Sequence, residues 1–239
     1  MAVEVTVDAS TQLRDLNAAI QKHWSTAGES LALATASAAD DLALWLVHFR
    51  SMALSPTASD LLSGAQAAAL DTIAYAFLGL GRAAITSIRL QVELLIGYTY
   101  FKDHPIEWDA VRQTGDGFMM VSAVTKYHSD IDPTLTARMQ MASQRLSPTL
   151  QQMYKILSAH VHGQSPYTLP KSGPLQTIVV DEATMRLIVE LQTQSIDAVS
   201  TFLVAVYAHD WPQLPQTFVS RVAKGLTPTQ RKKFFSDPV

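Results

Sequence analysis

The stretch Arg82-Ala-Ala-Ile-Thr-Ser-Ile-Arg-Leu-Gln-Val-Glu-Leu-Leu-Ile96 decides the fold of this chain. Apolar residues cover most of the circumference of a helix drawn through it, which is typical of a helix surrounded by other helices. One polar stripe interrupts them, formed at intervals of four, three and four residues by Arg82, Thr86, Arg89 and Glu93. Because charges on a buried helix are unfavourable unless they are paired, the stripe predicts either a structural polar seam or a functional site.

Proline and glycine residues mark the ends of further helices on both sides of this segment. We expect helices at about 10–24, 40–54, 60–80, 82–101, 107–127, 133–145, 148–162 and 181–207. The helix at 107–127 is expected to break near Gly115, and residues 25–39 carry no clear pattern. Alternating strand–helix units are missing, so the predicted fold class is all-α, an up-and-down helical bundle.

Two short β-branched stretches are the candidates for strands. Val3, Val5 and Val7 alternate with other residues near the N-terminus, and Thr177-Ile-Val-Val180 precedes the last long helix. We expect at most a short strand pair between the N-terminal arm and residues 177–180.

Composition limits the class of protein. The chain has 239 residues, of which 48% are hydrophobic and 16% are charged, so it can bury a large core and is not disordered. Its net charge of -3 gives no global attraction to nucleic acid, and the lack of cysteine excludes disulfides, thiolate catalysis and Cys-ligated metals. Glu4 and Asp8 argue against a signal peptide, and Asp71 interrupts the most apolar stretch. We therefore expect a cytoplasmic protein with no membrane segment.

The distribution of charge predicts two parts. Residues 1–210 form the helical bundle domain, and residues 211–239 form a basic C-terminal tail. The tail carries five Lys and Arg residues against one acidic residue, for a net charge of +4.

The segment Gln152-Met-Tyr-Lys-Ile-Leu-Ser-Ala-His-Val-His-Gly163 holds the most informative polar residues. At 100° per residue, His160 falls on the apolar side of the helix, whereas Lys155 and His162 share a polar side with Ser158 between them. His160 can serve as a core-edge histidine, and His162 can stabilise the C-terminus of the helix. Alternatively, His162 is a general acid or base near neutral pH, and Lys155 is a cation for phosphate.

No metal or cofactor site is expected. The two histidines of the His-x-His pair face different directions, whereas one metal ion needs convergent ligands. His128, Asp130 and Asp132 could bind a divalent ion, but such residues more often cap turns.

The two polar segments together resemble the HEPN superfamily. Tyr154-Lys-Ile-Leu-Ser158 followed by Val161-His162-Gly163 is similar to a branch whose members end this helix in a Ser-x-x-x-His pattern. The segment 82–100 is similar to the central helix of that branch, which carries an acidic residue. The resemblance implies a compact helical bundle that forms homodimers in bacterial defence, toxin–antitoxin or stress systems and cleaves RNA without a metal.

The resemblance also implies roles for individual residues. In active members an arginine stands four to six residues before a histidine, and in this sequence Lys155 takes that place before His162. Arg89, on the neighbouring helix, is a candidate to supply the missing guanidinium, with Glu93 beside it. The predicted catalytic residues are His162, Lys155, Arg89 and Glu93, and the predicted binding residues are Tyr154, Ser158, Arg82 and His160.

Three functions remain open from the sequence. The first is a dimeric, metal-independent endoribonuclease that acts on RNA. The second is a catalytically inactive helical module that binds a partner protein, such as a toxin or another subunit. The third is a binder of a small molecule in an apolar cavity between helices.

Overall fold

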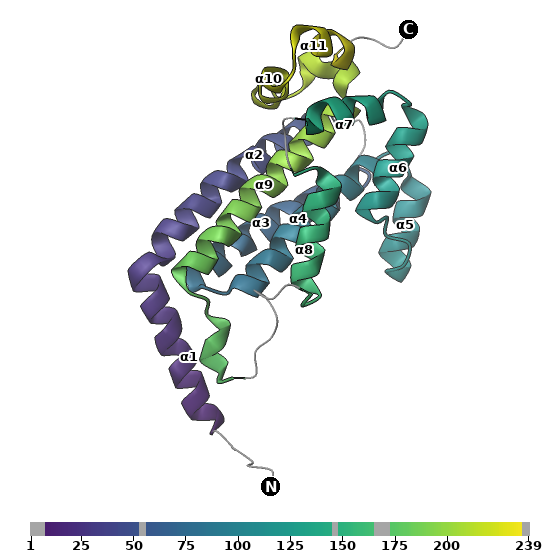
Figure 1. Ribbon diagram of the computed structural model, residues 1–239. Coiled ribbons are helices and arrows are strands. Elements are labelled where there is room, and N and C mark those ends of the chain that lie inside the picture. The colour runs from purple at the N-terminus through teal and green to yellow at the C-terminus, as the bar shows by residue number, and fades with distance from the viewer. Residues whose placement is uncertain (1–7, 53–55, 145–147, 165–172, 236–239) are drawn as a thin grey trace.

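The computed structural model describes residues 8–52, 56–144, 148–164 and 173–235, and within these ranges it contains eleven α-helices and no strand (Figure 1). The helices are α1 (Ala9–His23), α2 (Glu29–Met52), α3 (Ser59–Leu78), α4 (Gly81–Phe101), α5 (Pro105–Thr114), α6 (Val121–Ile131), α7 (Leu135–Ser143), α8 (Leu150–Val161), α9 (Glu182–Val206), α10 (Gln216–Gly225) and α11 (Pro228–Phe234). The predicted all-α helical bundle is therefore confirmed.

Helix α4 is the centre of the bundle, as its apolar sequence predicts. It packs against α3, α8, α9 and α6, and Ile88, Leu95 and Ile96 on it are fully buried. One buried polar group also lies on it, because the side-chain amide of Gln91 forms hydrogen bonds with Gln192 of α9. The core thus surrounds the helix that carries the polar stripe.

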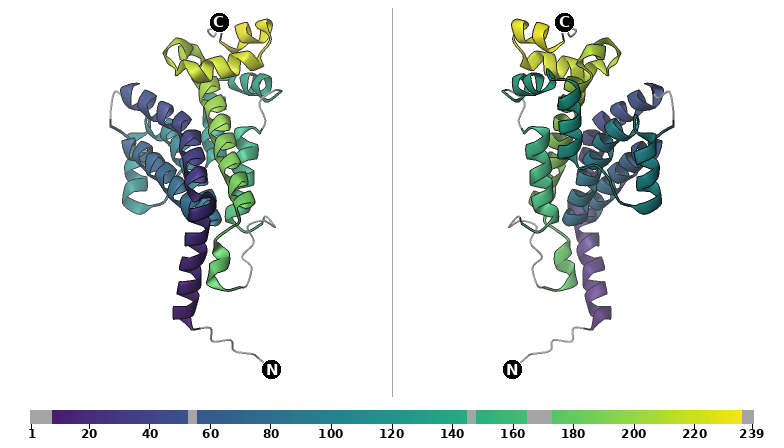
Figure 2. Two further views of the ribbon diagram at one scale, coloured as in Figure 1. Left: turned by 90° about the vertical axis from the view of Figure 1, so that its left-hand side faces the viewer. Right: turned by 90° about the vertical axis from the view of Figure 1, so that its right-hand side faces the viewer.

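Helices α1 and α2 form one long rod joined by a turn of π-helix, Trp24–Gly28. The sequence-based expectation of a helix that starts near Asp40 was wrong, since α2 begins at Glu29. Gly28 allows the π-helical turn to lie close against α3, because a Cβ atom at residue 28 would lie 2.5 Å from the carbonyl oxygen of Phe77 in α3. Figure 2 shows that α1 extends beyond one end of the bundle.

The segment before α9 is helical rather than extended. Leu175–Ile178 forms a 3₁₀-helix, so the short strand considered at 177–180 is not formed. The hydroxyl of Thr177 donates to the carbonyl of Pro174 at 2.8 Å, which favours the turn over a strand. The segment still meets the N-terminal region, because the backbone N–H of Leu175 donates to the side chain of Gln12 in α1 at 3.1 Å. The predicted strand at residues 3–7 lies outside the described residues.

Several predicted helix ends are confirmed. Gly79 ends α3 at a φ of +76°, and Gly115 ends α5 at a φ of +75°, where a left-handed conformation suits glycine. The chain resumes as α6 at Val121, so the expected break in 107–127 is present. The carboxylate of Asp181 accepts the backbone N–H of Thr184 at 2.7 Å and caps α9.

Much of the segment predicted as a basic tail packs on the bundle as α10 and α11, at the end opposite α1 (Figure 2). The ring of Phe218 in α10 stacks on Trp45 of α2, with ring centroids 5.0 Å apart and planes at 7°. Arg221 forms ion pairs with Asp41 and with Asp197. Arg221, one of the positive charges that suggested a tail, therefore anchors this segment to α2 and α9.

Two helical stretches, Ala9–Met52 and Ser59–Leu78, are long and apolar enough to cross a membrane. The second of these is α3, which packs against the buried α4.

Candidate functional site

The polar stripe of α4 lies where the helix meets α8. Arg82 and Thr86 near the start of α4 are exposed, whereas Arg89 and Glu93 are partly buried, with exposed side-chain fractions of 16% and 23%. A partly buried ion pair gains more from its charges than an exposed pair does, since less water screens it. Arg89 and Glu93, in the C-terminal half of the stripe, are therefore the residues that face another helix.

Helix α8 brings Tyr154 and His162 to this stripe. A capping box between Thr149 and Gln152 fixes the start of α8, and its buried residues Leu150, Met153 and Leu157 hold it against the core. His162 occupies the C-cap, where its backbone N–H donates to the carbonyl of Ser158 at 2.9 Å. Gly163 follows at a φ of +65° and ends the helix, as the sequence predicts.

Arg89, Glu93, Tyr154 and His162 form one group, which we call the Arg89 cluster. Oε1 of Glu93 accepts from Nε of Arg89 at 2.9 Å and from the Tyr154 hydroxyl at 2.7 Å. Nη2 of Arg89 also donates to the Tyr154 hydroxyl oxygen at 3.0 Å. This closed set of three hydrogen bonds fixes the plane of the guanidinium, and its carbon lies 5.2 Å from the centroid of the Tyr154 ring.

His162 completes the cluster from the end of α8. Its Nε2 lies 3.3 Å from Nη1 of Arg89, and the side chain is exposed. A guanidinium can only donate, so Nε2 is the acceptor and the neutral ring carries its proton on Nδ1. The basic nitrogen of an exposed imidazole is thus held beside a permanent cation.

The charges of the cluster are fixed by its contacts. Burial would lower the pKa of Arg89, but the hydrogen bond with Tyr154 and the charge of Glu93 outweigh it, so the pKa of Arg89 is raised. Burial and the hydrogen bond to Glu93 raise the pKa of the Tyr154 hydroxyl, against the opposing effect of Arg89. At neutral pH the cluster therefore holds a cation and a neutral phenol.

The predicted site residues are only partly brought together. Lys155 is exposed and makes no hydrogen bond or ion pair with any other described residue. It lies seven residues before His162, which is about 10 Å of helix rise. On α8 it is Tyr154, one position earlier, that points to the α4 stripe. The expected meeting of Lys155 with Arg89 and Glu93 is therefore not present.

Arg82 and His160 lie beside the cluster rather than in it. Together with Thr86 and Val161, they line a pocket of about 300 Å³ between the start of α4 and the end of α8. Burial lowers the pKa of His160. Since Thr86 is three residues before Arg89 and Val161 directly precedes His162, this pocket adjoins the cluster. Ser158 lies half-buried between Tyr154 and His162 on α8.

The residues weighed as metal ligands serve other purposes. His128 pairs with the Thr99 hydroxyl at 2.9 Å, and Asp130 forms an ion pair with Lys126 at 2.5 Å. Asp132 pairs with Arg138 at 2.6 Å. Within the described ranges no three His, Asp or Glu side chains converge.

A second buried polar group, which no sequence pattern indicated, surrounds Arg138. Arg138 is only 2% exposed, and besides Asp132 it contacts Nε2 of His209 at 2.9 Å. Asp132 and Arg138 are six residues apart and lie on different elements, so no helical spacing pairs them. Nε of Arg138 and Nδ1 of His209 are buried without a hydrogen-bond partner in the described structure. This group ties α7 to the end of α9.

Compared with known protein families, with curated proteins and with solved structures, the chain matches none.

Proposed function

We propose that this protein is an HEPN-like, metal-independent endoribonuclease of a bacterial defence, toxin–antitoxin or stress system. The observation that carries the proposal is the 3.3 Å approach of Nη1 of Arg89 to Nε2 of His162. Cleavage of RNA by its own ribose needs a base for the 2′-hydroxyl and a cation for the charge that develops on the phosphate. In this proposal α4 supplies the cation, Arg89, and the end of α8 supplies the base, His162.

The proposed reaction uses His162 as the base and Arg89 as the stabilising cation. When Nη1 of Arg89 turns to the phosphate and releases Nε2 of His162, Nε2 takes the proton of the 2′-hydroxyl, and the 2′-oxygen attacks the adjacent phosphorus. The bond from phosphorus to the 5′-oxygen breaks, and that oxygen takes up a proton from water. The products are a 2′,3′-cyclic phosphate and a free 5′-hydroxyl, with no metal needed to balance the step.

Glu93 and Tyr154 act as positioning residues in this proposal. They hold Nε and Nη2 of Arg89, which leaves Nη1 directed at His162 and at a phosphate placed beside it. The adjoining pocket, with Arg82 exposed at its edge, is large enough for part of a nucleotide. We further propose a homodimer, as the HEPN resemblance implies, located in the cytoplasm.

A second candidate function is a catalytically inactive helical module that binds a partner protein or a small molecule. It is favoured by the same hydrogen bonds, since each nitrogen of the Arg89 guanidinium already has a partner within the chain. Glu93 also neutralises its charge. In this case the cluster is a clamp between α4 and α8.

Cleavage of RNA by the purified protein in excess EDTA distinguishes the two functions. We expect His162→Ala and Arg89→Ala to abolish cleavage, and a substrate with 2′-deoxyribose at the scissile position to stay intact. Lys155→Ala is the matched control on the same helix and should cleave normally. Mass spectrometry should find the 2′,3′-cyclic phosphate. Equal activity of the His162→Ala protein would refute the role of His162 as the base. If the unaltered protein does not cleave RNA, the ribonuclease proposal is wrong and the inactive binding module is favoured.

A further inference from the structure

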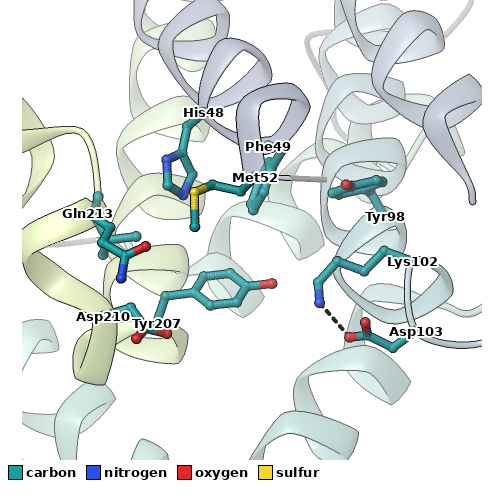
Figure 3. Close-up of a pocket in the computed structure, with 10 residues that line it drawn as sticks. His48, Phe49, Met52, Tyr98, Lys102, Asp103, Tyr207, Asp210 and Gln213 are labelled. Carbon is teal, nitrogen blue, oxygen red and sulfur yellow. Dashed lines mark hydrogen bonds and ion pairs between the residues drawn. The ribbon is translucent and has the colours of Figure 1, made fainter. Parts of the chain in front are cut away.

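A second pocket lies away from the Arg89 cluster and shares no residue with it. Its volume is about 370 Å³, and it is formed where the ends of α2 and α4 meet the 3₁₀-helix Ala208–Gln213 after α9 (Figure 3). Phe49, Tyr98 and Tyr207 give it aromatic walls, and His48 and Met52 lie above the ring of Tyr207 in Figure 3. A concave, largely aromatic pocket of this size fits a small organic molecule.

The Tyr207 hydroxyl is the unusual feature of this pocket. It points across the space towards Tyr98 and Lys102 (Figure 3). It is buried, and it has no hydrogen-bond partner among the described residues. A buried hydroxyl without a partner is unfavourable by itself. The hydroxyl therefore lacks a partner that a ligand or a water molecule reaching it would supply.

The charges around the pocket favour a positively charged ligand. Asp103 and Asp210 contribute two carboxylates, whereas Lys102 contributes one ammonium and is already paired with Asp103. Burial lowers the pKa of His48, so its imidazole is neutral at neutral pH. The net charge of these groups is therefore -1.

The aromatic rings add to this preference. Nζ of Lys102 lies 6.0 Å from the centroid of the Tyr207 ring, so that ring already presents its face to a cation. The ring of Phe49 packs with its centroid 5.1 Å from that of Tyr98 and 5.9 Å from that of Tyr207. Three rings in contact form a wall against which both an apolar body and a cation can lie.

We propose that this pocket binds a small organic ammonium compound, whose apolar body lies against Phe49, Tyr98 and Tyr207. Its ammonium group donates a hydrogen bond to the Tyr207 hydroxyl oxygen on the side of Asp103, and the charge of Asp210 acts from the other end of the Tyr207 ring (Figure 3). Binding at this site is independent of the proposed ribonuclease function, so His162→Ala should leave it unchanged.

The test is calorimetric titration of the full chain with three probes of similar shape. These are 2-phenylethylamine (a cation), 2-phenylethanol (neutral) and 3-phenylpropionate (an anion). We expect the amine to bind in a 1:1 ratio at least about tenfold more tightly than the alcohol, and the anion to bind least tightly. Equal binding of the alcohol or the anion would overturn the proposal, as would no binding of any probe, which would leave a buried water as the partner of Tyr207.

Variants separate a ligand site from a merely structural pocket. Tyr207→Phe removes an unpartnered hydroxyl and keeps the ring, so we expect a folded protein that binds the amine about tenfold more weakly. Lys102→Met removes the competing cation and should strengthen binding, whereas Asp210→Asn should weaken it. Tyr127→Phe is the matched control, since Tyr127 does not line the pocket. Unchanged affinity in the Tyr207→Phe protein would contradict the proposal.

Discussion

The side-chain amides of Gln91 and Gln192 bond to each other in both directions at the centre of the bundle. Nε2 of Gln192 donates to Oε1 of Gln91 at 2.7 Å, and Nε2 of Gln91 donates to Oε1 of Gln192 at 3.2 Å. Nε2 of Gln91 also donates to the hydroxyl of Thr72 at 2.8 Å. All three side chains are buried, so this network fixes how α3, α4 and α9 lie relative to one another.

Gln192→Met keeps the shape of the side chain and leaves the Gln91 carbonyl oxygen unpaired. We expect a loss of about 2 kcal/mol in the free energy of unfolding, because a buried polar group without a partner costs about 1–3 kcal/mol. Urea denaturation measures this, with the exposed Gln151→Met on α8 as control. The double variant with Gln91→Met should recover part of the loss, and a double variant that is less stable than the single one would contradict this account.

Phe218→Ala tests whether the C-terminal helices belong to the same cooperative unit as the bundle. Phe218 and Trp45 are both fully buried and stacked, so removing the ring should cost about 3–5 kcal/mol in a single unfolding transition. Thr217→Ala, on an exposed neighbouring position, should change little. Two separate transitions in the unaltered protein, or no loss with Phe218→Ala, would instead indicate an independent tail.

His128 predicts how stability depends on pH. Burial, and then the charge of Lys102, lower its folded-state pKa from 6.5 to about 4. Between these values the unfolded chain binds the proton and the folded one does not, so stability falls as the pH drops from 6.5 towards 4. The expected loss from this residue is about 2 kcal/mol at pH 5. Urea denaturation at pH 7 and pH 5 should show a smaller difference for His128→Gln, and an equal difference would refute the assignment.

Two glycine-to-alanine substitutions in helical positions should differ in their effect on stability. At Gly28 the new Cβ would lie 2.5 Å from the backbone carbonyl oxygen of Phe77, which cannot move without displacing α3. At Gly64 it would lie 2.9 Å from Cδ1 of Leu94, the end of a flexible side chain. We expect Gly28→Ala to lower the thermal midpoint, and Gly64→Ala to be neutral or to gain up to about 1 kcal/mol from helix propensity. The reverse order would contradict the tight approach of α3 to the π-helical turn.

Within the proposed function, Tyr154→Phe tests the positioning of Arg89. Loss of the hydroxyl removes one partner of the guanidinium and one of Glu93, so we expect kcat for RNA cleavage to fall about tenfold, which corresponds to about 1.4 kcal/mol. The neighbouring Lys155→Met should leave kcat unchanged, because Lys155 is exposed and has no contact with the cluster. If Lys155→Met lowered kcat more than Tyr154→Phe, Lys155 and not Tyr154 would belong to the catalytic site.

Helix positions could be predicted where local signals were strong. The apolar residues of α4 follow one another along the chain and therefore mark a buried helix. Gly115 ends α5 and Asp181 caps α9, and both effects depend only on residues close in sequence. The start of α2 was missed although residues 29–39 hold five alanines, which favour a helix, because Gly28 and the interspersed Ser and Thr residues hide any periodic pattern. At 177–180 the β-branched residues favoured a strand, but a local hydrogen bond from the Thr177 hydroxyl to the carbonyl of Pro174 favours the turn instead.

The sequence by itself determined that the chain is an all-α bundle around one apolar helix, and that this helix carries a charged stripe. Helical periodicity encodes these features, because it places residues on faces with a fixed spacing. Only the tertiary structure decided that Tyr154 and His162, and not Lys155, contact Arg89, because this depends on how α8 is rotated against α4. It also decided that Tyr98 and Tyr207, more than a hundred residues apart, share one pocket, since contacts between distant elements leave no periodic pattern in the chain.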